Sequence, residues 1–183
     1  SNTNGNDFTA VEIGPDGKLY AGTIDGRIIR YVINADGTLG AGQTFNTIKD
    51  LENGPRLLAG FAFDPASTAG NLILYVVHND FSFDEPAHWS GKITRLTGAD
   101  LEVGADIVIG LPRAAHNHVT NQPKFGPDGA LYITQGGNTA QGGADSTWGF
   151  RPETLLSAAI LRLDLTELPA SLPLNVQTED LGA

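Results

Sequence analysis

An internal repeat limits the fold of this chain more than any other feature of its sequence. Three segments share one order of residue types: an apolar strand end, a turn that contains aspartate, a strand that carries tyrosine, and a further strand that ends in arginine. The arginines of the three copies are Arg30, Arg95 and Arg162, at intervals of 65 and 67 residues. A fixed order of strands that recurs over tens of residues indicates one supersecondary unit copied along the chain.

The local composition predicts that these units are built from β-strands. Short stretches rich in Val, Ile, Leu, Tyr and Thr are bounded by Gly, Asp, Asn and Pro, which is typical of strands and turns. No stretch of a dozen residues keeps a helical period, and the nearest one, from Pro152, ends like a strand. We therefore predict an all-β chain, a β-propeller with about three four-stranded blades. Their expected bounds are 7–50, 51–110 and 111–183, after a leader or tag remnant over residues 1–6.

Charge and composition exclude several classes of partner and site. The net charge of −10 disfavours nucleic acid and anionic lipid as partners. The absence of cysteine excludes disulfides, thiolate metal sites and a cysteine nucleophile. No apolar run approaches the length of a membrane-spanning helix, and we expect no membrane partner. The loop from Asn34 resembles the start of a calcium loop, but it lacks the closing acidic residue, and a hairpin turn is favoured.

One long segment carries a resemblance to a known family. The segment from Gly110 to Gly143, the following strand that ends near Leu165, and the stretch from Leu57 to Pro65 resemble the glucose/sorbosone dehydrogenase family. The resemblance implies a six-bladed propeller that oxidises a sugar hydroxyl, with pyrroloquinoline quinone (PQQ) and Ca²⁺ as cofactors and hydride transfer to PQQ. It covers only the first half of the family's length, so most cofactor ligands are expected outside this chain. The implied location is secreted or periplasmic.

The resemblance also implies a catalytic base. In the family, a histidine eight residues before the glycine of the Gly-Pro-Asp-Gly turn takes the proton of the sugar hydroxyl, and that place is His118. A neutral imidazole accepts a proton near neutral pH. We expect His118 to face the propeller axis at a strand start, with Asn117 and Gln141 at the same end as candidate contacts of the cofactor.

Two places depart from the family's pattern. The family has an aspartate that orients the histidine where this chain has Gly137, and a Gln or Glu where it has Pro55. Without an orienting carboxylate, the tautomer of the base is not fixed. We therefore expect weak aldose oxidation and a gain of activity on Gly137→Asp.

Other interpretations remain open at the level of sequence. The chain could instead be a non-catalytic propeller module that binds glycan or protein within a larger secreted polypeptide. His116 and His118 are two residues apart and could hold a metal ion, although two ligands alone are weak evidence. Three blades leave open edges, so we also expect a second polypeptide segment that completes the ring.

Overall fold

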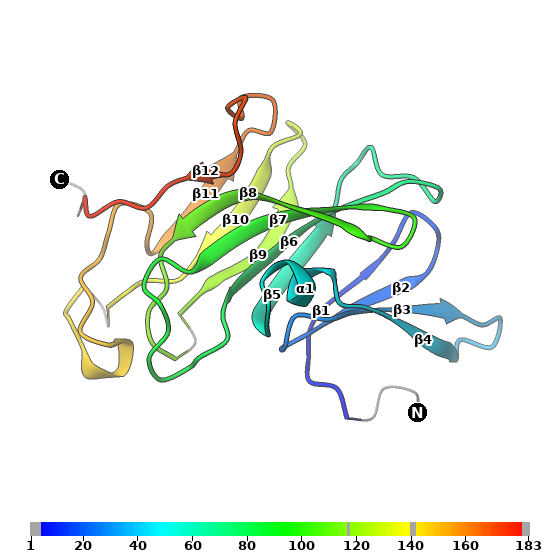
Figure 1. Ribbon diagram of the computed structural model, residues 1–183, viewed down its shortest axis with the longest axis horizontal. Helices are drawn as coiled ribbons and strands as arrows, with labels where there is room; N and C mark the ends of the chain where they lie inside the picture. Colours follow the sequence, from blue (N-terminus) through cyan, green and yellow to red (C-terminus); the bar gives the residue numbers. More distant parts are fainter. Residues whose placement is uncertain (1–4, 117, 140–141, 181–183) are drawn as a thin grey trace.

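The computed structural model describes residues 5–116, 118–139 and 142–180, and nearly all regular structure in it is β-strand. Three sheets follow one another along the chain and across the molecule, from the blue sheet to the orange one (Figure 1).

The first sheet is an antiparallel meander whose strands pair in chain order. It consists of β1 (Phe8–Ile13), β2 (Leu19–Thr23), β3 (Ile28–Ile33) and β4 (Leu39–Phe45). The short helix α1 (Thr47–Leu51) leads to the second sheet, whose order is β12-β8-β7-β6-β5. Its strands are β5 (Arg56–Phe63), β6 (Leu72–Asp80), β7 (Gly91–Gly98), β8 (Val103–Leu111) and β12 (Leu174–Asn175). The third sheet, in the order β11-β10-β9, has β9 (Thr120–Phe125), β10 (Leu131–Gln135) and β11 (Ala159–Leu163).

This architecture confirms the all-β partial propeller. It differs from the prediction in the third sheet, which has three strands within the described part of the chain instead of four. After β11 the chain runs back to the second sheet, where Leu174 pairs with Val108 in parallel orientation. The backbone N–H of Val176 then donates to the carbonyl of Ile109. The edge of β11 is consequently free of a neighbouring strand among the described residues.

The repeat read from the sequence is visible in the strand pairing. In each sheet, the tyrosine of the second strand lies directly opposite the arginine of the third strand. These cross-strand pairs are Tyr20–Arg30, Tyr75–Arg95 and Tyr132–Arg162.

The turn aspartate joins this pair in the first and third sheets. The hydroxyl of Tyr20 donates to Asp16 at 3.0 Å, and that of Tyr132 donates to Asp128 at 3.0 Å. Glycine precedes both turns because a Cβ at Gly126 would lie 2.5 Å from the Tyr132 ring, and Gly14 has the same contact with the tyrosine of its own sheet. The second copy has a longer turn, in which Asp64 accepts from the backbone N–H of Ala66 instead.

The hydrophobic core lies between the sheets. One cluster of buried side chains, which includes Tyr20, Phe61 and Leu96, joins the first and second sheets, and another, which includes Tyr75 and Ile133, joins the second and third. The first strands of the sheets, β1, β5 and β9, lie next to one another and form the inner side of the assembly. Blade-like sheets packed face to face with their first strands inside are the arrangement of a propeller.

Two smaller features of the sequence are settled by this fold. The loop from Asn34 is the hairpin turn between β3 and β4, closed by a hydrogen bond from the N–H of Gly37 to the Asn34 carbonyl. Asp36 uses its carboxylate on the backbone and side chain of Thr38 within the same turn. Among the described residues, no helix has the length and apolar character needed to cross a membrane.

Because the inner strands approach closely, we predict that substitution of Gly60 lowers the stability of the protein. A Cβ at Gly60 in β5 would lie 2.7 Å from the Cα of Gln122 in β9, so Gly60→Ala must push the strands apart. We expect a loss of about 1–3 kcal/mol in the free energy of unfolding. The matched control is Gly70→Ala, where the added Cβ meets nothing within 4 Å. Urea unfolding of both variants measures the difference, and equal stabilities would contradict the tight contact.

Candidate functional site

Three loops meet at the end of the sheets where β6 and β10 finish and β9 begins. The side chain of Asn79 exchanges hydrogen bonds with the backbone of Thr120, at 3.0 and 3.1 Å. The hydroxyl of Thr120 donates to the Gln135 side chain at 2.7 Å. These buried contacts bring together the loops 81–90, 112–119 and 136–158. The candidate base His118 lies in the second of them.

The His118 ring has a hydrogen bond at one edge and an aromatic ring stacked on one face. Its Nδ1 lies 2.8 Å from the carbonyl oxygen of Gly137. The indole of Trp148 stacks on the ring with the centroids 3.6 Å apart and an interplanar angle of 13°. Because a carbonyl oxygen only accepts, Nδ1 carries the proton of this hydrogen bond, and in the neutral ring Nε2 is the acceptor. Nε2 makes no hydrogen bond to another residue of the described chain.

The expectation that Gly137 leaves His118 without an orienting group is therefore wrong. The backbone carbonyl of Gly137 fixes the ring in place of a carboxylate at this position. The expected gain of activity on Gly137→Asp stays a prediction, and a Cβ there would lie 2.9 Å from Oε1 of Glu153. An aspartate would crowd and repel a carboxylate that is already present.

Glu153 gathers four donors around its carboxylate. The backbone N–H groups of Asn138 and Thr139 donate to it at 2.9 and 3.1 Å, and the Thr139 hydroxyl donates at 2.6 Å. The hydroxyl of Ser157 is the fourth donor. Burial acts to raise the pKa of Glu153, but these hydrogen bonds outweigh burial and lower the pKa below its usual value. Glu153 is thus ionised at neutral pH.

Two arginines tie the three loops together. Arg113 is fully buried and donates to the carbonyls of Ala114, His116 and Ser82. Burial lowers its pKa to about 10, so the guanidinium keeps its charge at neutral pH. Arg151 donates to the carbonyls of Arg113 and Pro86. Both side chains therefore use these N–H groups to hold the backbone of the loops.

The other predicted site residues have different outcomes. Asn117 and Gln141, the candidate contacts of the cofactor, lie outside the described residues. His116 is exposed, has φ of +56°, and meets the Trp148 ring edge-on at 6.4 Å. Within the described chain, the pair of His116 and His118 has no place in a group of metal-ligand atoms.

A cavity of about 270 Å³ opens beside the His118 loop on the inner side of the sheets. Its lining comes from the starts of β1, β5 and β9, from the turn after β2 and from the loop after β6. The lining residues are Thr9, Ile24, Leu57, Leu58, Ala59, Phe83, Val119 and Asn121. Val119 follows His118 in the chain, but His118 itself is not among the lining residues.

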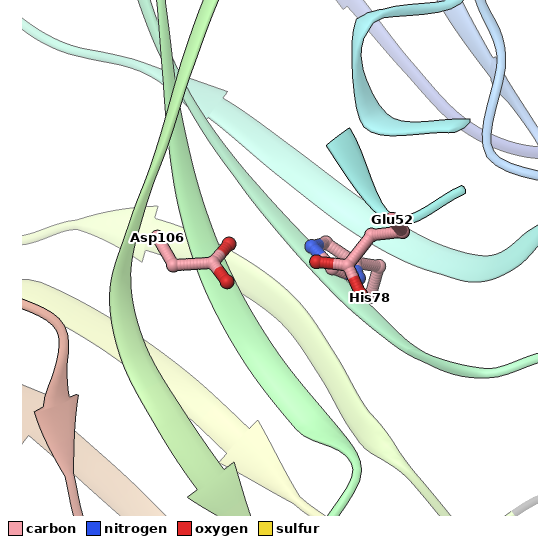
Figure 2. Close-up of side chains that lie close together, drawn as sticks. All are labelled: Glu52, His78 and Asp106. Atoms are coloured by element: carbon pink, nitrogen blue, oxygen red, sulfur yellow. The ribbon is translucent and has the colours of Figure 1, made fainter. Parts of the chain in front are cut away.

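A second cluster lies inside the second sheet and involves residues that sequence spacing did not bring together. Ligand-type atoms of Glu52, His78 and Asp106 all lie within 4.8 Å of one another, and no other such group occurs among the residues that the structure describes (Figure 2). The three come from the end of α1, from β6 and from β8.

The surroundings of this cluster make it a hydrogen-bonded network. Arg56 donates to Nδ1 of His78 at 3.0 Å, and Nε2 of the same ring lies 2.7 Å from the Thr94 hydroxyl. Thr94 in turn donates to Asp106 at 2.6 Å. Lys92 bridges the two carboxylates, at 2.6 Å from Glu52 and 2.9 Å from Asp106. Both ring nitrogens of His78 have hydrogen-bond partners, and the Lys92 ammonium lies between the two carboxylates. The side chains of the cluster thus satisfy one another.

The functional environment of His118 was only partly visible in the sequence. The histidine itself followed from its spacing to the Gly126 turn. Trp148, Glu153 and Arg113 were missed because the loops that carry them have no period, and their meeting depends on how three sheets pack. The glycine-rich segment from Gly136 to Gly149, with Trp148 in it and Arg151 just after it, is the one sequence signal that could have drawn attention to this end.

Comparisons with known proteins agree with the fold. A family model described as strictosidine synthase-like, N-terminal, matches residues 10–31, which span most of β1, all of β2 and part of β3. A crystal structure from Thermus thermophilus, provisionally described as an oxidoreductase (glucose dehydrogenase), is similar with a TM-score of 0.50 and 23% sequence identity. The likeness covers 87% of this chain and 44% of that one, so the chain spans less than half of the matched protein's length. No curated protein sequence matches the chain. At this identity, the comparison shows the fold: a partial β-propeller.

The buried His78 predicts a dependence of stability on pH. Burial first, and then the charges of Arg56 and Lys92, lower the pKa of His78 well below its usual value. Below about pH 6.5 the unfolded chain therefore binds a proton that the folded chain does not, and stability falls on acidification by up to about 1.4 kcal/mol per pH unit. His78→Gln removes this proton, so its free energy of unfolding should fall less steeply between pH 6.5 and 5. Parallel curves for the two proteins in urea titrations would contradict the assignment.

Proposed function

We propose that the chain is part of a sugar dehydrogenase-like propeller that oxidises an aldose hydroxyl, with His118 as the general base. The observation that carries this proposal is the state of the His118 ring: Nδ1 is bonded to the Gly137 carbonyl, which leaves Nε2 as a proton acceptor. The propeller fold and the similarity to a protein described as a glucose dehydrogenase support the substrate class. A secreted or periplasmic location is part of the same proposal.

In this reaction the chain's own residues hold and deprotonate the substrate. A sugar hydroxyl that approaches Nε2 would give up its proton to the ring, while the Gly137 carbonyl keeps Nδ1 protonated. The Trp148 stack fixes the plane of the ring. The cavity beside Val119 offers an aromatic side chain, Phe83, and the polar groups of Thr9 and Asn121. Such a mixture of apolar and hydrogen-bonding groups suits a sugar ring.

The cofactor expected from the resemblance is PQQ with Ca²⁺, and the described residues do not by themselves form its site. The lining of the cavity contains no basic or acidic side chain that could hold the carboxylates of PQQ or a calcium ion. The nearby Arg113 and Arg151 donate to backbone carbonyls. We therefore derive no step through the quinone from this chain, and we propose that the groups that bind PQQ and Ca²⁺ come from a further segment.

A second candidate function is a non-catalytic propeller module that binds glycan or protein. The observation that favours it is the close packing of the same histidine, whose Nδ1 bonds to backbone and whose face is covered by Trp148. A histidine held only for structure would have these two contacts as well. The two functions differ in whether Nε2 of His118 accepts a proton from a substrate, and activity measurements can decide between them.

We further propose that a second polypeptide segment completes the propeller. The third sheet ends at β11, where Ile160 is 73% exposed. On the first sheet, Val11 and Ile13 are 66% and 53% exposed. Apolar side chains on the two outermost sheets and a strand edge without a neighbour are the features that further blades would cover.

The catalytic proposal predicts a selective loss on removal of one histidine. In a dye-reduction assay of the intact protein supplied with PQQ, Ca²⁺ and aldoses, His118→Gln should lower kcat/KM by about 10²–10⁴-fold, the usual worth of a general base. The matched control is His116→Gln, two residues away and exposed, which should keep most of the activity. If the wild-type protein oxidises no aldose but binds to immobilised glycans, the module function holds instead.

The completing segment predicts a larger particle than this chain. Native mass spectrometry of the protein purified from its source should show an assembly or a continuous polypeptide heavier than 19.2 kDa. Added sheets should also protect the amide groups of β11 from hydrogen exchange. A well-behaved monomer of 19.2 kDa with exchanging β11 amides would show that no such segment is needed.

A further inference from the structure

We propose that Glu153 is a positioning residue that fixes the tautomer of His118 through the peptide group between Gly137 and Asn138. The carboxylate thus performs at a distance the task that a side chain at position 137 would perform directly. The inference deepens the proposed function of the same site, but it concerns the ring itself and can be tested without turnover.

The geometry rests on a single peptide unit. Its N–H end belongs to Asn138 and donates to Oε2 of Glu153 at 2.9 Å. Its C=O end belongs to Gly137 and accepts from Nδ1 of His118 at 2.8 Å. In a trans peptide these two groups lie in one plane and point in opposite directions. Carboxylate, peptide and imidazole therefore form a continuous chain of two hydrogen bonds.

The surroundings hold this chain rigidly. Asn138 is fully buried, and its side chain donates to the carbonyl of Pro152 at 2.9 Å. Thr139 and Ser157, both nearly buried, donate to the same carboxylate. The space beside Gly137 is filled by Glu153, since a Cβ at Gly137 would lie 2.9 Å from its Oε1. The glycine thus lets the carboxylate approach its own peptide.

The chemical effect follows from polarisation. A negative charge on the N–H end of a peptide strengthens the acceptor at the C=O end, because hydrogen bonds in a chain reinforce one another. A stronger acceptor at Nδ1 favours the Nδ1–H tautomer and so keeps the lone pair on Nε2. When Nε2 takes a proton, the same carboxylate faces the new positive charge through the peptide. Glu153 acts through other groups and does not touch the substrate.

The test reads the tautomer of His118 by long-range ¹H–¹⁵N NMR of the intact protein labelled on histidine, with His118→Gln used to assign the signal. Wild-type protein should show the Nδ1–H form. Glu153→Gln keeps the size of the side chain but removes its charge, and the ratio of the Nε2–H to the Nδ1–H form should rise roughly five- to tenfold, as expected for a weakened hydrogen bond to a charged group.

Two control variants separate this role from general support of the loop. Thr139→Val removes the hydroxyl donor to Glu153 but keeps the bond from the Asn138 N–H, so the tautomer ratio should stay as in wild type. Glu167→Gln removes a charge from an exposed position outside the three loops and should change nothing.

Each outcome decides the matter. A Glu153→Gln protein with an unchanged ratio, or a Thr139→Val protein with the same rise as Glu153→Gln, would overturn the proposal. If Glu153→Gln does not fold, Glu153→Asp takes its place, because it keeps the charge but draws the carboxylate back from the Asn138 N–H, and an unchanged ratio in it would overturn the proposal. A wild-type His118 in the Nε2–H form would contradict the relay as well. The wild-type ring could also be in the Nδ1–H form and respond to Glu153→Gln in a protein that oxidises no aldose. That result would contradict the proposed function and support the role of Glu153.

Discussion

The pairing of a tyrosine with an arginine across neighbouring strands, joined by the turn aspartate in two of the sheets, is the interaction on which the structure depends. The arginines are exposed or half-buried, whereas Tyr20 and Tyr75 are buried in the core. An exposed ion pair such as Arg162–Asp128 contributes little energy. The value of these groups is in register, since a slip of one residue would turn every core side chain to the wrong face. At the opposite end, after a shift of register between Ile133 and Gln135, Gln135 pairs with Thr120, where the His118 loop ends.

The sequence therefore predicted the fold through the same residues that hold it. The tyrosine and the arginine recur at equivalent places in all three sheets, and the Pro-Asp-Gly turn recurs in the first and third, which made the blades visible. The departures could not be seen in this way. Helix α1 is a five-residue connection, and β12 is a two-residue strand whose partner lies far away in the chain. Such short elements depend on tertiary contacts and have no period of their own.

The candidate site was predictable to the extent that it follows a motif. His118 has a fixed spacing from a turn, whereas its partners Trp148 and Glu153 come from the segment between β10 and β11, whose one regular element in the described residues is the three-residue 3-10 helix η1 (Ser146–Trp148). The missing aspartate at position 137 suggested a loss of orientation. The structure shows instead that backbone can replace a side chain, which no residue type in the sequence records. The network around His78 illustrates the same limit. Glu52 lies before the second sheet in the chain and Asp106 lies in β8, so their meeting at His78 depends on the fold.

The return of the chain from the third sheet to the second also bears on the order in which the molecule can form. The pairing of Leu174 with Val108 closes a loop that contains the whole third sheet. Long loops are costly to close until other contacts hold their ends near each other. The cost of closing this loop therefore favours packing of the third sheet before β12 docks on the second. The topology thus makes the completion of the second sheet depend on the third, which lies between its strands in the sequence.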